Sequence, residues 1–133
     1  MTPERAGDAV NVNGFDHLVL RTTDVERLLD FYLTVLGLAP VRLEDWRAGR
    51  APFPSARISQ TAIIDFVPVD EQPTGSVLDH FCLVVDPVDW NAEIAAGLAV
   101  THGPVSRYGA QGVATSVYVT DPDGNVVELR HYG

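Results

Sequence analysis

The sequence contains a single cysteine, Cys82, among its 133 residues, so no disulfide can form within the chain. No uninterrupted apolar segment approaches the roughly 20 residues that a membrane-spanning helix needs. Residues 1–13 lack the basic and then apolar order of a secretion signal, and we expect them to form a flexible N-terminal tail. Together these absences favour a cytoplasmic protein without a membrane partner.

Basic residues are also few, because 9 arginines and lysines stand against 18 acidic residues, for a net charge of −9. No basic cluster offsets the acidic surface, which would repel the phosphates of DNA or RNA, so we expect no nucleic-acid partner. A glycine-rich phosphate loop, a nucleophile elbow and a Cys-x-x-Cys pair are missing from the sequence. These absences argue against nucleotide hydrolysis, serine-based hydrolysis and a structural zinc site.

One motif is present twice, in residues 16–20 and in residues 79–83, each time as Asp-His-apolar-apolar-Leu. A repeat of this kind indicates duplicated structural units. Both copies lie in stretches rich in β-branched and aromatic residues, which is typical of strands. With 46% hydrophobic and 20% charged residues, the chain has the composition of a globular domain, and we expect that domain to have two similar halves.

A helix is predicted after each of these strands. In the first half, Thr23 and Glu26 have the spacing of a capping box, and Gly37 has the place of a left-handed cap at the helix end. In the second half, we expect Asp86 to cap the helix and Gly97 to end it. Three strands follow each helix, over residues 39–46, 55–60 and 61–68, and over residues 100–105, 113–120 and 125–131.

The predicted order of elements is therefore βαβββ twice, an α+β fold in one domain from residue 14 to residue 133. Module one spans residues 14–69 and module two spans residues 77–132. Residues 70–76, which include a proline and a glycine, form the predicted link between the modules.

Equal spacing relates a carboxylate to each histidine of the repeated motif. Asp65 follows His17 by 48 positions, and Glu128 follows His80 by the same 48 positions. Each half therefore carries a histidine on its first predicted strand and an acid on its last. Because duplicated modules keep equivalent residues in equivalent places, we expect the two histidines and two acids to converge about a pseudo-twofold axis.

Both acids share a strand face with apolar residues, Asp65 with Ile63 and Val67, and Glu128 with Val126. A carboxylate in such surroundings loses hydration energy unless a cation or strong hydrogen-bond donors meet it. Two imidazoles and a carboxylate, with positions left for water or substrate, suit Fe(II), Mn(II), Zn(II), Ni(II) or Co(II). The alternative is that each of these residues has an ordinary structural role, as most single histidines and acids do.

Four segments resemble the vicinal oxygen chelate superfamily: residues 16–20, 31–38, 79–81 and 117–129. The second reads Phe-Tyr-Leu-Thr-Val-Leu-Gly-Leu, and the last ends in Asp-Pro-Asp-Gly-Asn-Val-Val-Glu-Leu. The superfamily includes glyoxalase I, extradiol dioxygenases, fosfomycin-modifying enzymes, methylmalonyl-CoA epimerase and bleomycin-binding proteins, and these motifs do not distinguish among its activities. The resemblance implies two βαβββ modules that form a cupped, barrel-like mixed sheet around one divalent metal ion.

The resemblance also implies roles for individual residues. His17, His80 and Glu128 stand where members of the superfamily place their metal ligands, and Asp65 stands where glyoxalase I places a fourth ligand, a glutamate. Because its side chain is one methylene shorter, Asp65 is expected to bind the metal through water or to act as a base beside it. Tyr118 has the place of a substrate-contacting tyrosine in extradiol and fosfomycin-modifying relatives, where a phenol can donate to an oxyanion, or else it is an ordinary strand aromatic.

Other residues are candidates for contact with a small-molecule substrate. Residues 103–112 resemble a substrate loop of several relatives, so Arg107 and Tyr108 are expected near the site, with Trp46 added from the first half. Arg130 shares a strand face with Glu128 and is expected either to meet a substrate carboxylate or to pair with an acid at the sheet rim. Outside the site, we expect surface positions for His102 and His131 and a small core position for Cys82.

These expectations describe a divalent-metal-dependent enzyme that acts on a small oxygenated metabolite, with glyoxalase-like lyase or isomerase chemistry favoured. Extradiol dioxygenase and fosfomycin-modifying chemistries are alternatives, although ring cleavage is disfavoured because Asp65 stands where extradiol dioxygenases carry a histidine. A non-catalytic binding protein of the bleomycin-resistance type is an alternative of a different class, which the net charge of −9 suits. The resemblance further implies a homodimer, whose sites can draw their two modules from different subunits.

Overall fold

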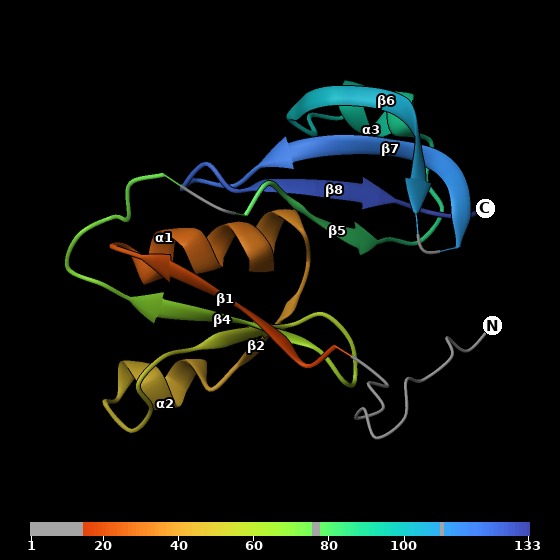
Figure 1. Cartoon of the computed structure of the whole chain (residues 1–133). Coiled ribbons are helices and arrows are strands. Elements are labelled where there is room, and N and C mark those ends of the chain that lie inside the picture. Colours follow the sequence, from red (N-terminus) through yellow and green to blue (C-terminus); the bar gives the residue numbers. More distant parts are fainter. Residues whose placement is uncertain (1–14, 76–77, 110) are drawn as a thin grey trace, which may run out of the picture.

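The computed structural model describes residues 15–75, 78–109 and 111–133, which form two modules, each with one four-stranded sheet (Figure 1). The first sheet has the order β1-β4-β3-β2, comprising His17–Thr22, Ile63–Pro68, Ser55–Arg57 and Ala39–Val41. The second has the order β5-β8-β7-β6, comprising Phe81–Val84, Val126–Arg130, Gly112–Thr120 and Val100–Gly109. The predicted α+β fold with two βαβββ modules is confirmed.

Each module places its first strand parallel to its last, and this pairing brings the histidine and the acid of that module together. Val19 lies opposite Asp65 in the β1–β4 pair, and Cys82 lies opposite Glu128 in the β5–β8 pair. Side chains two residues apart on a strand share a face. His17 therefore lies on the face of Asp65, and His80, which directly precedes β5, is next to the face of Glu128.

The opposite face of each sheet packs onto one hydrophobic core that both modules share. Figure 1 shows helix α1 (Val25–Asp30) between the two sheets, and its Leu28 and Leu29 are buried. On β8, Val127 and Leu129 belong to the same buried cluster, so the acid between them lies on the other face. Within one chain the two sheets therefore stay separate, and their polar faces point away from the shared core.

A π-helical turn, η1 (Phe31–Val35), continues α1 without a break. The N–H of Leu36 donates to the carbonyl five residues earlier, at 3.3 Å, which widens the turn and rotates the side chains that follow. Tyr32 is fully buried, whereas Val35, three residues later, is 53% exposed. The Tyr32 hydroxyl donates to Asp121 at 2.8 Å and thereby joins module one to the end of β7.

Both predicted helix starts are corrected by the structure. The side chain of Asp24 caps α1 by accepting a backbone N–H of the first turn at 3.1 Å, in place of the predicted capping box at Thr23. Helix α3 (Trp90–Ala95) begins after Asp89, whose carboxylate accepts two backbone N–H groups. The predicted cap at Asp86 is wrong because Asp89 directly precedes the one buried residue of the helix and already satisfies its free N–H groups.

The strand predicted over residues 39–46 is wrong beyond Val41. Residues Leu43–Arg47 form a short helix, α2, instead. Arg42 has a φ of +57°, a left-handed conformation that turns the chain out of the strand. Trp46 consequently packs against the hydrophobic core from α2, and its contact with a substrate stays a prediction.

Strands β6 and β7 form a long hairpin where a substrate loop and a short strand were predicted. β6 continues to Gly109, which pairs with Gly112 at the hairpin tip. The register shifts on both sides of His102, which lies within the strand. Residues 103–109 of the predicted substrate loop are therefore part of β6, the edge strand of the second sheet.

The predicted N-terminal tail, residues 1–13, and the end of the predicted link lie outside the described residues. Among the helices that the structure does describe, none has the length and apolar character that crossing a membrane requires.

Candidate functional site

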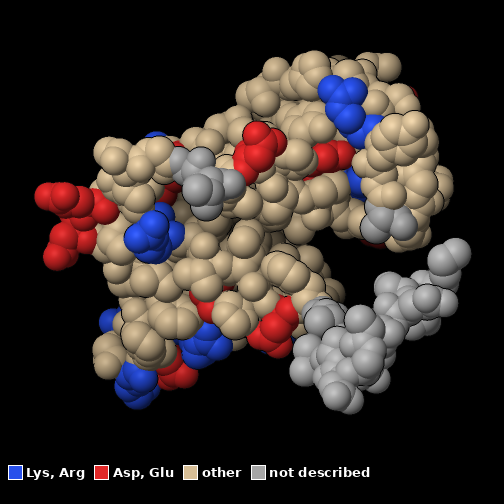
Figure 2. Space-filling view, in the orientation of Figure 1, with Lys and Arg blue, Asp and Glu red and all other residues tan. Residues whose placement is uncertain are grey.

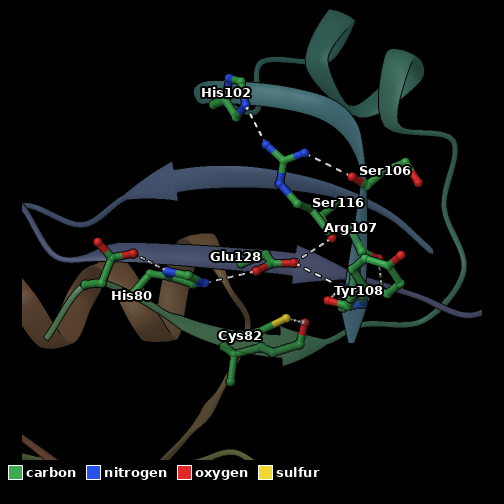
Figure 3. A network of polar contacts seen from close by, with 11 residues as sticks. His80, Cys82, His102, Ser106, Arg107, Tyr108, Ser116 and Glu128 are labelled. Carbon is green, nitrogen blue, oxygen red and sulfur yellow. Dashed lines mark hydrogen bonds and ion pairs between the residues drawn. The ribbon is translucent and has the colours of Figure 1, made fainter. Parts of the chain in front are cut away.

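The polar face of module two brings together a histidine and an acid that the sequence analysis predicted as ligands. His80 Nε2 lies 3.2 Å from Glu128 Oε1 (Figure 3). On its other side, His80 Nδ1 lies 2.6 Å from the Asp79 carboxylate. A carboxylate only accepts hydrogen bonds, so the Nδ1 position carries the proton. This arrangement, in which a carboxylate fixes the ring of a histidine, is typical of metal ligands.

The contact between His80 Nε2 and Glu128 Oε1 requires a proton or a cation between the two atoms. With Nδ1–H donated to Asp79, a neutral His80 directs the lone pair of Nε2 at a carboxylate oxygen. Two lone pairs repel each other at this distance unless a proton or a metal ion lies between them. The donor set, an imidazole nitrogen and a carboxylate oxygen, is one that Zn(II), Fe(II), Ni(II), Co(II) and Mn(II) accept.

Two further donors fix the second oxygen of Glu128 and leave the first one available. Ser116 donates to Oε2 at 2.7 Å (Figure 3), and Arg130 donates to the same oxygen at 3.2 Å. Burial raises the pKa of Glu128, but the Ser116 hydroxyl, the Arg130 guanidinium and His80 together hold it below its usual value. The carboxylate is therefore ionised at neutral pH, with Oε1 directed at His80.

Module one repeats this arrangement with looser dimensions. His17 Nδ1 lies 2.7 Å from Asp16, and the hydrogen bond to this carboxylate raises the pKa of His17 above its usual value. His17 Nε2 lies 4.0 Å from Asp65 Oδ2. Ser55 donates to Asp65 Oδ1 at 2.6 Å, and Arg42 approaches the same oxygen at 3.6 Å. Both acids thus have one oxygen held by a serine and an arginine and the other oxygen turned towards a histidine.

The structure of one chain does not bring the three predicted ligands together. His80 meets Glu128, and His17 meets Asp65 instead. In the described ranges no group of three or more His, Cys, Asp or Glu side chains is close enough to hold a metal ion. The two sheets carry these pairs on separate polar faces, so the expected convergence about a pseudo-twofold axis does not occur within a single chain. We call each histidine–acid pair, with the serine and arginine beside its acid, a half-site.

Aromatic and basic side chains extend the module-two half-site along β6 and β7. The ring of Tyr118 packs edge-on against His80, with 5.7 Å between centroids, and on its other side lies His102 at 5.6 Å. Arg107 approaches His102 Nε2 at 3.2 Å (Figure 3). His102 therefore belongs to the surroundings of the half-site, although it was predicted to lie outside the site. The sequence analysis also missed Ser116, which occupies the same strand face two residues before Tyr118.

Three more expectations are corrected by their contacts. Arg130 is 2% exposed and lies within the fold, so the predicted place at a sheet rim is wrong. His131 stacks on Trp90, with 5.7 Å between centroids, and is held by the Val88 carbonyl at 2.9 Å, so it is not an ordinary surface residue. Cys82 is exposed rather than a core residue. Partial burial and the adjacent Glu128 carboxylate raise the pKa of its thiol to about 11, which keeps it protonated at neutral pH.

A cavity of about 620 Å³ lies at the junction of the modules. It is bordered by β1, by the link and by the turn before β8, and none of the four paired histidines and acids lines it. Two of its lining residues adjoin the half-sites: Asp79, which orients His80, and Val19, which lies opposite Asp65. On the face shown in Figure 2, acidic and basic side chains are interspersed and no continuous basic patch is visible.

The fold and the paired half-sites define a class of protein that comparison with known sequences identifies. The family model of the Glyoxalase/Bleomycin resistance protein/Dioxygenase superfamily matches residues 14–129, and the chain belongs to this superfamily. The predicted resemblance to the vicinal oxygen chelate superfamily is thereby confirmed.

Individual relatives cover most of the chain. The virulence protein STM3117 of Salmonella typhimurium is 34% identical over 124 residues, which cover 91% of this chain and 85% of that protein. The lactoylglutathione lyase of Escherichia coli O157:H7 is 29% identical over 122 residues, which cover 85% of this chain and 88% of the lyase. Among solved structures, an integron cassette protein of V. cholerae has a TM-score of 0.73 at 28% identity and covers 94% of this chain and 99% of its own.

Proposed function

We propose that the protein is a divalent-metal-dependent enzyme that acts on a small oxygenated molecule, with His17, His80 and Glu128 as ligands drawn from two copies of the chain. The observation that carries this proposal is the geometry of the half-sites. Each histidine has its Nδ1 fixed by a preceding aspartate and its Nε2 turned towards a carboxylate oxygen. One half-site supplies too few ligands for a metal centre, so a second copy is needed to complete it.

The open edges of the two sheets support this assembly. Among the described strands, β1 and β5 each lie at the edge of a sheet, where backbone N–H and C=O groups are available for pairing with another chain. Both edges also expose an apolar side chain, Val19 at 47% and Val84 at 61%. Pairing β1 of one copy with β5 of a second copy would join His17 and His80 across one seam. The proposed protein is therefore a homodimer with two shared sites.

A bound metal ion would act as a Lewis acid that stabilises negative charge on substrate oxygens. Beside it, Asp65 is the candidate proton carrier, because it is buried yet has one oxygen directed at His17. Tyr118 lies against His80, where its hydroxyl can donate to a substrate oxyanion. Arg107 and Tyr108 on the β6–β7 hairpin are the candidates for substrate contact at the outer end of the site.

Within this scheme, lyase or isomerase chemistry of the glyoxalase type is favoured over the dioxygenase and fosfomycin-modifying types. It needs a base beside the metal, a role that Asp65 can fill, and the similarity to a lactoylglutathione lyase points the same way. Iron, manganese, nickel, cobalt and zinc all suit the ligand set.

Subunit complementation tests the shared site. His17→Ala and His80→Ala each remove one ligand, so homodimers of either variant are expected to lose high-affinity cobalt binding. If sites combine modules of different subunits, unfolding and refolding a mixture of the two variants restores one intact site in each heterodimer. Cobalt absorption spectra of the mixture, with light scattering to establish the dimer, measure this recovery. A mixture that binds no more cobalt than its components, or a monomeric mass, contradicts the shared site.

The alternative of a non-catalytic binding protein is supported by one separate observation, the cavity of about 620 Å³ that borders Asp79 and Asp123 but excludes the paired ligands. Carboxylates beside such a cavity suit a small cationic ligand. Wild-type protein that takes up no cobalt, nickel, manganese, iron or zinc, while binding a cationic aromatic dye in a manner sensitive to Asp123→Asn, would establish this alternative over the enzyme.

A further inference from the structure

Arg130 is among the largest fully buried side chains of the protein, and its surroundings explain how a guanidinium can be accommodated there. It lies on β8 two residues after Glu128, on the same strand face. A buried charge is costly unless it is paired and its donors are satisfied. Glu128 Oε2 supplies the opposite charge at 3.2 Å. The remaining partners come from a different part of the molecule, the tip of the β6–β7 hairpin.

The guanidinium donates to three backbone carbonyls of this hairpin. Nη2 donates to the carbonyl of Arg107 at 2.9 Å and to that of Gly112 at 3.0 Å, and Nη1 donates to the carbonyl of Tyr108 at 3.0 Å. Nη1 also makes the contact with Glu128, so one nitrogen joins the acid directly to the hairpin backbone. The planar fork of an arginine can make all these contacts at once, whereas the single ammonium of a lysine cannot.

Tyr132 completes this contact from the end of the chain. The Arg130 guanidinium lies 5.0 Å from the centroid of the Tyr132 ring, and the Tyr132 hydroxyl accepts the backbone N–H of Gln111 at 3.2 Å. Both strands of the hairpin are thus held by side chains that follow Glu128 in the sequence.

Gly109 permits this close packing by its lack of a side chain. A Cβ atom at this position would lie 2.5 Å from Arg130 Cζ and would also collide with the Tyr132 hydroxyl. The backbone of Gly109 does not have the positive φ found at other glycines of the chain, so the need for glycine here is one of space alone. A side chain at position 109 would therefore force Arg130 and Tyr132 to shift away from the hairpin tip.

We propose that Arg130 is a positioning residue that couples the β6–β7 hairpin to Glu128, and that Gly109 is required for this coupling. The inference rests on the proposed role of Glu128 as a metal ligand. Arg130 and Ser116 occupy Oε2, which assigns Oε1 as the single ligand oxygen of Glu128. Because the hairpin also displays the side chains of Arg107 and Tyr108, a substrate that orders the hairpin strengthens metal binding. The metal reciprocally orders the hairpin, as thermodynamic linkage requires.

Two variants break the coupling in different ways, and two others serve as comparisons. Gly109→Ala pushes Arg130 away from the hairpin, and Arg130→Lys keeps the charge but not the set of hydrogen bonds. Ser116→Ala removes a donor to Glu128 Oε2 without touching the hairpin tip. Val113→Thr is the matched control, because Val113 lies on the same hairpin with its side chain 60% exposed. Circular dichroism and thermal unfolding establish that each variant is folded.

Cobalt titration and amide hydrogen exchange of the hairpin are the two measurements. Gly109→Ala and Arg130→Lys are expected to weaken cobalt binding by roughly 10- to 100-fold, the usual effect of losing a group that orients a ligand. The same two variants are expected to speed hydrogen exchange at residues 107–113. Ser116→Ala should weaken cobalt binding and leave the exchange of the hairpin as it is in the wild type. Val113→Thr should change neither quantity.

Each outcome decides the inference. Cobalt affinity that is the same in wild type, Gly109→Ala and Arg130→Lys overturns it, as does hairpin exchange that Arg130→Lys leaves unchanged. Wild-type protein that binds no cobalt rejects the proposed metal site instead. In that event hydrogen exchange alone decides whether Arg130 holds the hairpin: faster exchange in both variants, with no change in Val113→Thr, supports the structural part of the inference.

Discussion

The two half-sites use the same kinds of residues but differ in how tightly they are held. In module two, His80 Nε2 and Glu128 Oε1 are 3.2 Å apart, and the arginine that holds the acid is 2% exposed. In module one, the corresponding distance from His17 to Asp65 is 4.0 Å, and the side chain of Arg42 is 38% exposed. Glutamate reaches the histidine where the shorter aspartate does not. The two modules therefore differ: the histidine and the acid are in close contact in module two and are further apart in module one.

This difference predicts unequal roles for the two acids in metal binding. Glu128→Gln is expected to weaken cobalt binding by more than about 100-fold, because it removes a ligand and not merely a group that orients one. Asp65→Asn is expected to weaken it by less than about tenfold, since Asp65 is proposed as a proton carrier beside the metal and not as a ligand. Isothermal titration measures both. Glu71→Gln, at an exposed position, controls for loss of one negative charge. Equal losses in the two variants would show that the half-sites are equivalent.

The aspartate that precedes each histidine provides the next comparison. Asp79→Asn is expected to weaken cobalt binding by roughly tenfold or more, because an amide no longer favours the proton on His80 Nδ1. Asp16→Asn is expected to have an effect of the same kind on His17. Nitrogen chemical shifts of the two imidazoles report the tautomer in each variant. Unchanged shifts in Asp79→Asn would mean that the carboxylate does not set the tautomer.

Lengthening the acid of module one tests whether one methylene explains the difference between the half-sites. Asp65→Glu is expected to bring the carboxylate within reach of the metal and to strengthen cobalt binding by a few-fold, about 1 kcal/mol. The d–d absorption of bound cobalt is expected to weaken as a further oxygen ligand raises its coordination number. Leu98→Met, a substitution of similar added length away from both half-sites, is the control. Weaker binding in Asp65→Glu would show that this position serves a role other than that of a ligand.

The serines that hold the acids give the smallest expected effect. Ser116→Ala leaves a buried carboxylate with one donor fewer, and we expect it to lower the free energy of unfolding by about 1–3 kcal/mol. Ser55→Ala is expected to cost less, because the half-exposed Arg42 and water can approach Asp65 in its place. Denaturant unfolding of the metal-free protein compares the two. A larger loss of unfolding free energy in Ser55→Ala than in Ser116→Ala would contradict the proposal that module two holds its acid more firmly.

Much of this arrangement was predictable from the sequence because it depends on repeats and strand alternation. The spacing of His17 from Asp65, and of His80 from Glu128, predicted two modules with equivalent positions. The parallel pairing of first and last strands places each histidine beside the acid of its own module. The predicted convergence of the two histidines and two acids on one point is wrong for a single chain. Spacing specifies which residues are equivalent, but the packing of α1 between the sheets decides which way their polar faces point.

The serine and arginine partners of the acids were not predicted, for a physical reason. Ser55 lies directly opposite Asp65 across two antiparallel strands, and Ser116 lies opposite Arg130. These contacts depend on strand register, which turn lengths set and which composition does not reveal. Arg42 reaches Asp65 only because a left-handed backbone at that residue ends β2 early, and nothing in its sequence neighbourhood signals that conformation.

The adjacency of aspartate and histidine in each repeated motif has a consequence for how such a centre can arise. In the proposed site, the ligand and the group that orients it are consecutive residues at the start of the first strand of each module. A single short segment therefore carries both wherever that segment is placed. Duplication of one module therefore duplicates both the histidine and the aspartate that orients it. A self-associating ancestor with a single module could therefore have assembled a metal centre from two identical chains, and fusion of its genes would preserve the chemistry while freeing each copy to diverge.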